Sequence, residues 1–239
     1  MLKAEKERRQ RMDVELYYRE YGSGKPLILL HGNSEDSGYF DRQLGTLSER
    51  YHVYTVDTRG HGRSPRGQAP FTLDQFARDL HDFMDERGIR KANILGFSDG
   101  GNIALLFALR WPQRVDRLIL CGANLFPSGL KPFTLLRVNA AYVLLSPFAE
   151  KSECLKKRTE LLHLMAREPH IDPALLARLT APTLVVAGTH DVIRESHTRL
   201  VARSLPCARL CILPGWHSVA RGNPAAFNRA VLEFLDETD

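Results

Sequence analysis

The chain has 239 residues, of which 44% are hydrophobic and 26% charged, a mix typical of a folded globular protein and not of a disordered one. No apolar run reaches the roughly 18–20 residues that a membrane span requires. The net charge is +5, but 33 basic residues are interleaved with 28 acidic ones, which disfavours a nucleic-acid-binding protein. Residues 1–12 form a charge run, expected to be a solvated face, without the apolar segment of a signal peptide. We therefore expect a cytoplasmic protein.

Short apolar segments alternate with amphipathic ones along most of the chain. The segments predicted as strands are 14–21, 26–30, 51–56, 92–97, 117–121, 183–187 and 208–213. The predicted helices that alternate with them are 72–87, 101–109 and 224–235, the first opening with the capping box Thr72-x-x-Gln75. This alternation predicts a mostly parallel sheet with helices on both faces. In such sheets ligands bind beyond the carboxyl ends of the strands, so we expect the catalytic groups there.

Residues 124–180 contain no predicted strand. Residues 132–145 are apolar nearly all round, residues 150–166 form a second helix candidate, and Asp172-Pro173 begins a third. An insertion of this length at the reactive edge predicts a short helical cap (124–180) on a core domain (1–123 and 181–239); the alternative is that its helices form a layer of the main core. Because helix 132–145 is too apolar to leave one face in water, we expect it to pack on the sheet edge and line an apolar pocket.

The sequence Gly96-Phe97-Ser98-Asp99-Gly100 follows a predicted strand and opens a helix. In this context a tight turn exposes the serine hydroxyl, which predicts Ser98 as a nucleophile. A serine nucleophile needs a base and an acid that orients the base. His217 follows the last strand and Asp191 the one before it, so they are the predicted base and acid. His190, beside Asp191, is the competing histidine.

Two backbone N–H groups should stabilise the oxyanion, and those of Asp99 and Asn33 are predicted for this role. The carboxylate of Asp99 is unexpected there, because two unit charges about 4 Å apart interact by roughly 4 kcal/mol at a dielectric of 20. Two explanations stay open. Asp99 turns away and is paired by a local Arg, His or backbone donor, or it binds a cation on the substrate, such as the amino group of an amino-acid ester. Phe97, Asp99 and Trp216 are the candidate substrate contacts.

Five motifs, in this order, resemble the α/β-hydrolase superfamily. They are His31-Gly32-Asn33, Asp57-x-Arg59-Gly60-His61-Gly62-x-Ser64, the turn at Ser98, Gly188-x-x-Asp191 and His217. The resemblance implies the α/β-hydrolase fold, with an eight-stranded, mostly parallel sheet and a helical cap, and a structural role for residues 57–64. More narrowly, Ser98-Asp99-Gly100-Gly101 together with Gly122-Ala123-Asn124 is similar to the biphenyl-hydrolase-like (valacyclovirase-type) serine esterases.

The expected function is that of a serine hydrolase that cleaves a small carboxylic ester through an acyl-enzyme intermediate, with amino-acid esters among the candidates. One alternative is hydrolysis of a C–C bond, lactone or thioester by the same residues, and another is a non-catalytic ligand-binding sensor on the same fold. No metal or cofactor is expected, because the sequence has no H-E-x-x-H or Cys-x-x-Cys motif. We expect a monomer acting on a small-molecule ester, without nucleic-acid or membrane partners.

Overall fold

A seven-stranded sheet forms the centre of the molecule, in the strand order β1-β3-β2-β4-β5-β6-β7. The structure is a computed structural model and describes residues 13–237. β1 runs antiparallel to its neighbour β3, and the remaining strands are mutually parallel. The strands are β1 (Tyr18–Tyr21), β2 (Lys25–Leu30), β3 (Tyr51–Val56), β4 (Ala92–Phe97), β5 (Val115–Cys121), β6 (Thr183–His190) and β7 (Ala208–Trp216).

The resemblance implied a sheet of eight strands, whereas the sheet has seven strands in residues 13–237. Of the predicted strand 14–21, only Tyr18–Tyr21 pairs with a neighbour. The preceding residues bind a loop instead: the Asp13 carboxylate accepts the N–H groups of Gln68 and Ala69, and the N–H of Tyr17 donates to Ser64 Oγ. The carbonyl oxygen of Tyr17 accepts the N–H of Asp57, the residue after β3, so pairing with β3 itself begins at Tyr18. The charge run of residues 1–12 lies outside the described residues.

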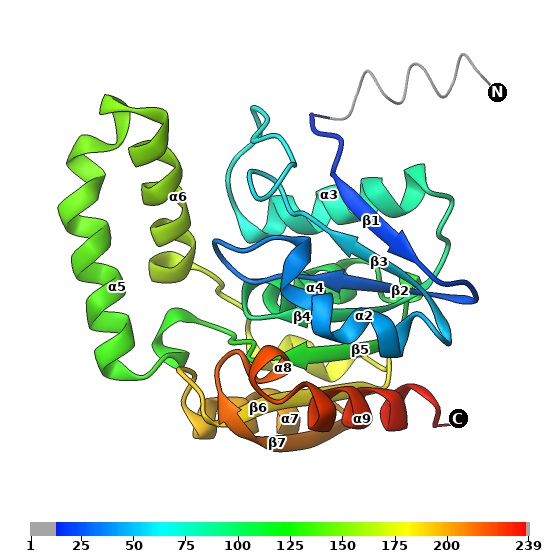
Figure 1. The fold of residues 1–239 in the computed structure, drawn as a ribbon. Helices are drawn as coiled ribbons and strands as arrows, with labels where there is room; N and C mark the ends of the chain where they lie inside the picture. The colour runs from blue at the N-terminus through cyan, green and yellow to red at the C-terminus, as the bar shows by residue number, and fades with distance from the viewer. Residues whose placement is uncertain (1–12, 238–239) are drawn as a thin grey trace, which may run out of the picture.

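Helices cover both faces of the sheet, as the alternating pattern predicted (Figure 1). Alternate side chains of β2 point to opposite faces, so Ile28 and Leu30 lie in one hydrophobic cluster and Leu27 and Leu29 in the other. The first cluster includes α3 (Leu73–Glu86), α4 (Asp99–Arg110) and α7 (Glu195–Ser204). The second includes α2 (Asp41–Leu47), α8 (Val219–Gly222) and α9 (Pro224–Leu235). Short 3-10 turns join several elements: η1 (Ser37–Phe40), η2 (Pro112–Arg114), η3 (Pro127–Gly129) and η5 (Pro173–Arg178).

A pair of helices stands between β5 and β6 and projects from the rest of the molecule (Figure 1). The α5–α6 hairpin consists of α5 (Pro132–Leu145), the 3-10 segment η4 (Ser146–Lys151) and α6 (Glu153–Arg167). α6 lies between α5 and the core, so α5 does not pack on the sheet edge as expected. Leu164 of α6 is buried in the first core cluster, whereas Val138 is the one buried residue among those described in α5. The sequence of α5 is apolar on every side, so it does not indicate which side is buried.

Candidate active site

Ser98 occupies a tight turn between the end of β4 and the start of α4. Its backbone has φ 52° and ψ −119°, in the left-handed region that a non-glycine residue adopts only under strain. The neighbouring glycines allow this turn, because a Cβ on Gly96 would lie 2.2 Å from the carbonyl oxygen of Gly100. A Cβ on Gly100 would lie 2.1 Å from the carbonyl oxygen of Leu30. The turn therefore requires glycine at these two positions and holds the Ser98 hydroxyl at the N-terminus of α4.

The structure brings Ser98, His217 and Asp191 together in one hydrogen-bonded chain. His217 Nε2 lies 3.0 Å from Ser98 Oγ, and His217 Nδ1 lies 2.6 Å from Asp191 Oδ1. A carboxylate only accepts hydrogen bonds, so the Nδ1–H of the imidazole donates to Asp191. Nε2 is then left with a lone pair that faces the serine hydroxyl. The competing histidine, His190, instead contacts the ring of Trp216.

Asp191 is buried and remains an anion. Burial raises the pKa of its carboxyl group, but the hydrogen bond from His217 and the backbone N–H groups of Ile193 and Gly188 outweigh burial, so the pKa is lowered. The ionised carboxylate fixes the tautomer of His217 and would stabilise its protonated form. This arrangement is suited to a proton transfer between Ser98 and His217.

The loop after β2 faces the N-terminus of α4 and is held by its own side chains. His31 Nδ1 donates to the carbonyl oxygen of Gly32 over 2.7 Å, and its Nε2 accepts the N–H of Thr58 over 3.0 Å. Glu35 Oε2 accepts the N–H of Gly32 over 3.2 Å. The first N–H groups of a helix have no carbonyl partner within the helix, so the N–H of Asp99, the first residue of α4, is suited to bind an oxyanion.

Residues 57–64, which follow β3, form hydrogen bonds to the segment that follows β2. Asp57 accepts the N–H groups of Ser37 and Arg63 over 2.7 and 2.8 Å. The guanidinium of Arg59 is fully buried and forms two hydrogen bonds to the carboxylate of Asp79, of 2.7 and 2.6 Å. None of the side chains in residues 57–64 lines the cavity that contains Ser98.

A cavity of about 290 Å³ opens beside Ser98 and His217. Asn33, Phe97 and Asp99, which are predicted oxyanion donors or substrate contacts, are among its lining residues. Trp216 is not among its lining residues: the indole is 73% exposed, because successive side chains of a strand point to opposite sides. Further lining residues that sequence reasoning missed are Ser34, Glu35, Asn124, Leu130, Thr134, Met165, Glu168, Val192, Ile193 and Ser218. α5 contributes Thr134 to this lining, not the apolar wall that was expected.

Three carboxyl groups line this cavity, those of Glu35, Asp99 and Glu168, and no Lys or Arg does. Burial raises the pKa of all three, and the negative charge of Asp99 raises that of Glu168 further. Asn33 Nδ2 donates to Asp99 Oδ2 over 2.9 Å, and Asn102 Nδ2 lies 3.5 Å from Asp99 Oδ1. In residues 13–237 no Lys or Arg forms an ion pair with Asp99, so two neutral amides are its side-chain partners.

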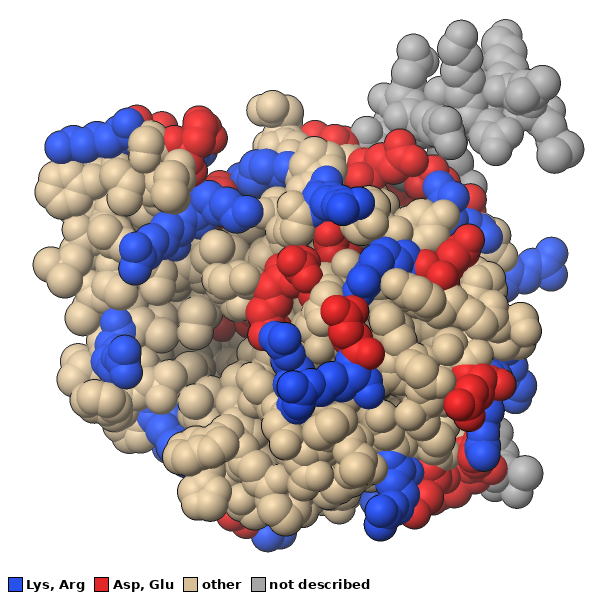
Figure 2. All heavy atoms as spheres, viewed as in Figure 1, with Lys and Arg blue, Asp and Glu red and all other residues tan. Residues whose placement is uncertain are grey.

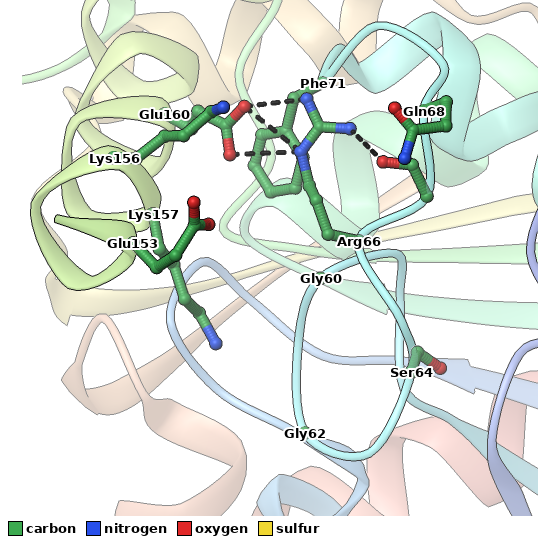
Figure 3. Close-up of a pocket in the computed structure, with 11 residues that line it drawn as sticks. Gly60, Gly62, Ser64, Arg66, Gln68, Phe71, Glu153, Lys156, Lys157 and Glu160 are labelled. Carbon is green, nitrogen blue, oxygen red and sulfur yellow. Dashed lines mark hydrogen bonds and ion pairs between the residues drawn. The ribbon is translucent and has the colours of Figure 1, made fainter. Parts of the chain in front are cut away.

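A second, larger cavity of about 650 Å³ lies between α6 and residues 60–71 (Figure 3). Arg66 forms hydrogen bonds to both carboxylate oxygens of Glu160 on α6, the shortest of 2.7 Å. Ser64 lines this cavity, but its hydroxyl donates to the carbonyl oxygen of Asp57 over 2.7 Å. The residues of the Ser98–His217–Asp191 chain do not line it.

In the part of the chain that the structure describes, no three His, Cys, Asp or Glu side chains are grouped as a metal site requires.

The chain is similar in sequence and in fold to several known proteins. The family model described as "alpha/beta hydrolase fold" matches residues 25–148. The "Putative carbamate hydrolase RutD" of Azorhizobium caulinodans is 28% identical, over 95% of this chain and 97% of that protein. The "Serine hydrolase BPHL" of Homo sapiens is 27% identical, over 93% of this chain and 83% of its own length. Among solved structures, a hydrolase from Pseudomonas aeruginosa matches with a TM-score of 0.79 and 27% identity, over 95% of this chain and 100% of that chain.

Proposed function

Because this chain belongs to the α/β-hydrolase family, we propose that it is a serine hydrolase that cleaves a small carboxylic ester, with a preference for esters that carry an amino group. The proposal that the protein is a serine hydrolase rests on the hydrogen-bonded chain from Ser98 Oγ through His217 to Asp191. The preference for an amine rests on the Asp99 carboxylate, which has no cationic partner in residues 13–237.

The proposed reaction proceeds in two steps that use the same residues. Ser98 Oγ attacks the ester carbonyl carbon while His217 Nε2 takes the hydroxyl proton, and Asp191 stabilises the resulting imidazolium. The N–H groups of Asp99 and Asn33 bind the oxyanion. The alcohol leaves with the proton from Nε2, and a water molecule then attacks the acyl-enzyme with His217 as the base. The carboxylic acid leaves and Ser98 regains its proton.

Asp99 supports the preference for an amine on electrostatic grounds. An uncompensated carboxylate beside the reacting carbonyl repels the oxyanion, whereas a bound ammonium group would cancel this repulsion. The carboxyls of Glu35 and Glu168 line the same cavity and no Lys or Arg does, so the ammonium group of a substrate would meet no positively charged side chain there. Of the two explanations that the sequence left open for Asp99, pairing with a substrate cation is the one we propose.

The nucleophile is tested by labelling with a fluorophosphonate and by hydrolysis of p-nitrophenyl acetate. Wild type should be labelled at one serine, and Ser98→Ala should lose labelling and up to about a million-fold in turnover. A wild-type protein that is labelled but hydrolyses none of a panel of esters, lactones, thioesters and carbamates would be a sensor rather than an enzyme. Faster turnover of a carbamate, lactone or thioester than of the matched ester would overturn the ester assignment.

The amine preference is tested on two esters of similar shape, the benzyl esters of alanine and of propanoic acid. Asp99→Asn should lose about 10- to 100-fold in kcat/KM on the alanine ester and little on the propanoate, as expected for a charge-assisted contact. Asp116→Asn, which changes a half-buried carboxylate in β5 that pairs with Lys91, is the matched control and should lose nothing on either ester. Equal losses on both esters for Asp99→Asn would leave that residue a structural role only.

A further inference from the structure

The outer face of α5 is the largest run of exposed apolar side chains in the described residues. We define this α5 outer face by Phe133, Leu136, Val143, Leu144 and, in η4, Phe148. Their exposed fractions are 69%, 66%, 61%, 70% and 44%. Only two other large hydrophobic residues in residues 13–237 are comparably exposed, Leu175 and Trp216. A contiguous apolar surface of this kind on a folded protein marks an interaction site.

The α5 outer face cannot be covered by the protein's own core, because the opposite side of α5 packs on α6. Tyr142 Oη lies 3.2 Å from His163 Nδ1, and Arg167 donates to Asn139 Oδ1 over 2.8 Å. α6 in turn lies between α5 and the sheet (Figure 1). The face therefore points outward.

The charges around the α5 outer face are mainly positive. Residues 131–151, from Lys131 before α5 to the end of η4, contain three basic side chains and one acidic one, a net charge of +2. Two of the cations lie against the aromatic rings of the face: Arg137 is 5.7 Å from the ring centre of Phe133, and Lys151 is 4.5 Å from that of Phe148. In Figure 2 the surface over α5 is mostly tan with blue side chains beside it.

In place of the expectation that the protein has no membrane partner, we propose that the α5 outer face is a docking surface for an anionic lipid bilayer, on which α5 lies parallel to the membrane plane. An apolar face flanked by Lys and Arg is the pattern of helices that lie in the membrane interface, where apolar side chains enter the headgroup region and the cations bind acidic lipids. No described helix is long and apolar enough to cross a membrane, so the helix would lie on the bilayer rather than span it. The proposal concerns a surface and does not depend on which bond the enzyme cleaves.

Charge favours a bilayer over a second copy of the chain as the occupant. Two copies docked through this face would bring Arg137 and Lys151 of one molecule close to the same cations of the other, and like charges in a desolvated interface are unfavourable. An anionic lipid surface instead offers a negative partner for each cation. The N-terminal end of the face also lies beside the active-site cavity, because Leu130 and Thr134, the neighbours of Lys131 and Phe133 in sequence, line that cavity.

The test is co-sedimentation of the full chain with vesicles of phosphatidylcholine alone and of phosphatidylcholine mixed with phosphatidylglycerol. We expect binding to the mixed vesicles, weaker binding to the neutral ones, and loss of the difference in high salt. The double variant Leu136→Gln/Leu144→Gln should bind the mixed vesicles at least about tenfold more weakly. The affinity of Arg137→Gln/Lys151→Gln for the mixed vesicles should fall about 30-fold, because each cation near an anionic surface contributes about fivefold to binding. Its affinity for neutral vesicles should change little.

Matched variants elsewhere on the surface control for a general change in polarity. Leu175→Gln replaces an exposed leucine in η5, and Arg203→Gln replaces an exposed arginine in α7. Both should bind the vesicles as wild type does, and all variants should keep the melting temperature of wild type. The proposal is overturned if wild type does not bind the mixed vesicles, or if the control variants lose as much as those on the face. It is also overturned if ultracentrifugation shows a dimer that Leu136→Gln/Leu144→Gln dissociates, because the face would then bind a second copy.

Discussion

Replacing Gly100 by alanine should separate the nucleophile from the loop that faces it. The added Cβ would lie 2.1 Å from the carbonyl oxygen of Leu30 and 2.6 Å from that of His31, and both are backbone atoms at the end of β2. Real Cβ atoms essentially never approach closer than 3.0 Å, so α4 and this loop must move apart by 3.0 − 2.1 = 0.9 Å. The proposed oxyanion donors, on Asp99 and Asn33, belong to these two segments. A displacement of about 1 Å in a catalytic site costs on the order of 100-fold in rate.

The variant is measured by kcat/KM on p-nitrophenyl acetate, with the active fraction titrated by a fluorophosphonate. We expect a loss of about 100-fold per active site. Overpacking should also cost about 1–3 kcal/mol of stability, and each kcal/mol lowers Tm by about 2–4 °C for a chain of this size. Gly45→Ala, in α2, is the matched control, because a Cβ there would meet no atom within 4 Å. Alanine in a helix is favoured by about 1 kcal/mol over glycine, so this variant should keep its activity and melt at an equal or higher temperature.

The two effects of Gly100→Ala can be separated. If the loss came only from unfolding, kcat/KM per titrated active site would equal that of wild type below the melting temperature. That result, or a Tm and turnover both within error of wild type, would refute the argument from close backbone contact.

Three further predictions concern ion pairs. Asp79→Asn leaves the buried Arg59 guanidinium without its main partner and should lower the free energy of unfolding in urea by about 3–5 kcal/mol; a loss below about 1 kcal/mol would contradict this. The N–H of Ala69, the guanidinium of Arg59 and the N–H of Gln68 lower the pKa of Asp13 from 3.8 to about 2. A lowered pKa stabilises the fold above the unfolded value, so the stability advantage of wild type over Asp13→Asn should be full above pH 4 and disappear as the pH falls towards 2, in urea titrations at each pH. Arg66→Gln breaks a partly exposed pair and should cost less than about 1 kcal/mol by calorimetry; a larger loss would show that the pair is more than a surface contact.

The resemblance to the α/β-hydrolase superfamily is confirmed, and so is the mostly parallel sheet covered by helices on both faces. Strand–helix alternation is a local pattern, so the sequence was sufficient to predict it. The positions of Ser98, Asp191 and His217 follow from the same logic, because each lies directly after a parallel strand and all these strands end at one edge. Their roles stay predictions until the variants are measured.

The placement of α5 could not be predicted because it depends on contacts distant in sequence. Its residues are apolar all round, so no periodicity distinguishes the side that packs on α6 from the exposed side. Glu168 was missed for a related reason: it follows α6, and only the path of the hairpin brings it to the cavity beside Asp99. Trp216, a predicted substrate contact, does not line this cavity although it precedes His217 in sequence, because it is the last residue of β7 and its side chain is exposed.

The side-chain amide of Asn33 gives the hairpin a direct effect on the carboxylate next to the nucleophile. One Nδ2 atom donates both to Asp99 Oδ2, over 2.9 Å, and to the carbonyl oxygen of Leu161 in α6, over 3.1 Å. An amide nitrogen has two protons, so these two bonds use its full donor capacity. A displacement of α6 would break the bond to Leu161 and release the amide to rotate, which removes a stabilising donor from Asp99. The pKa of the Asp99 carboxyl group would then depend on the position of the α5–α6 hairpin relative to the core. The affinity of this carboxylate for a cation would change with it.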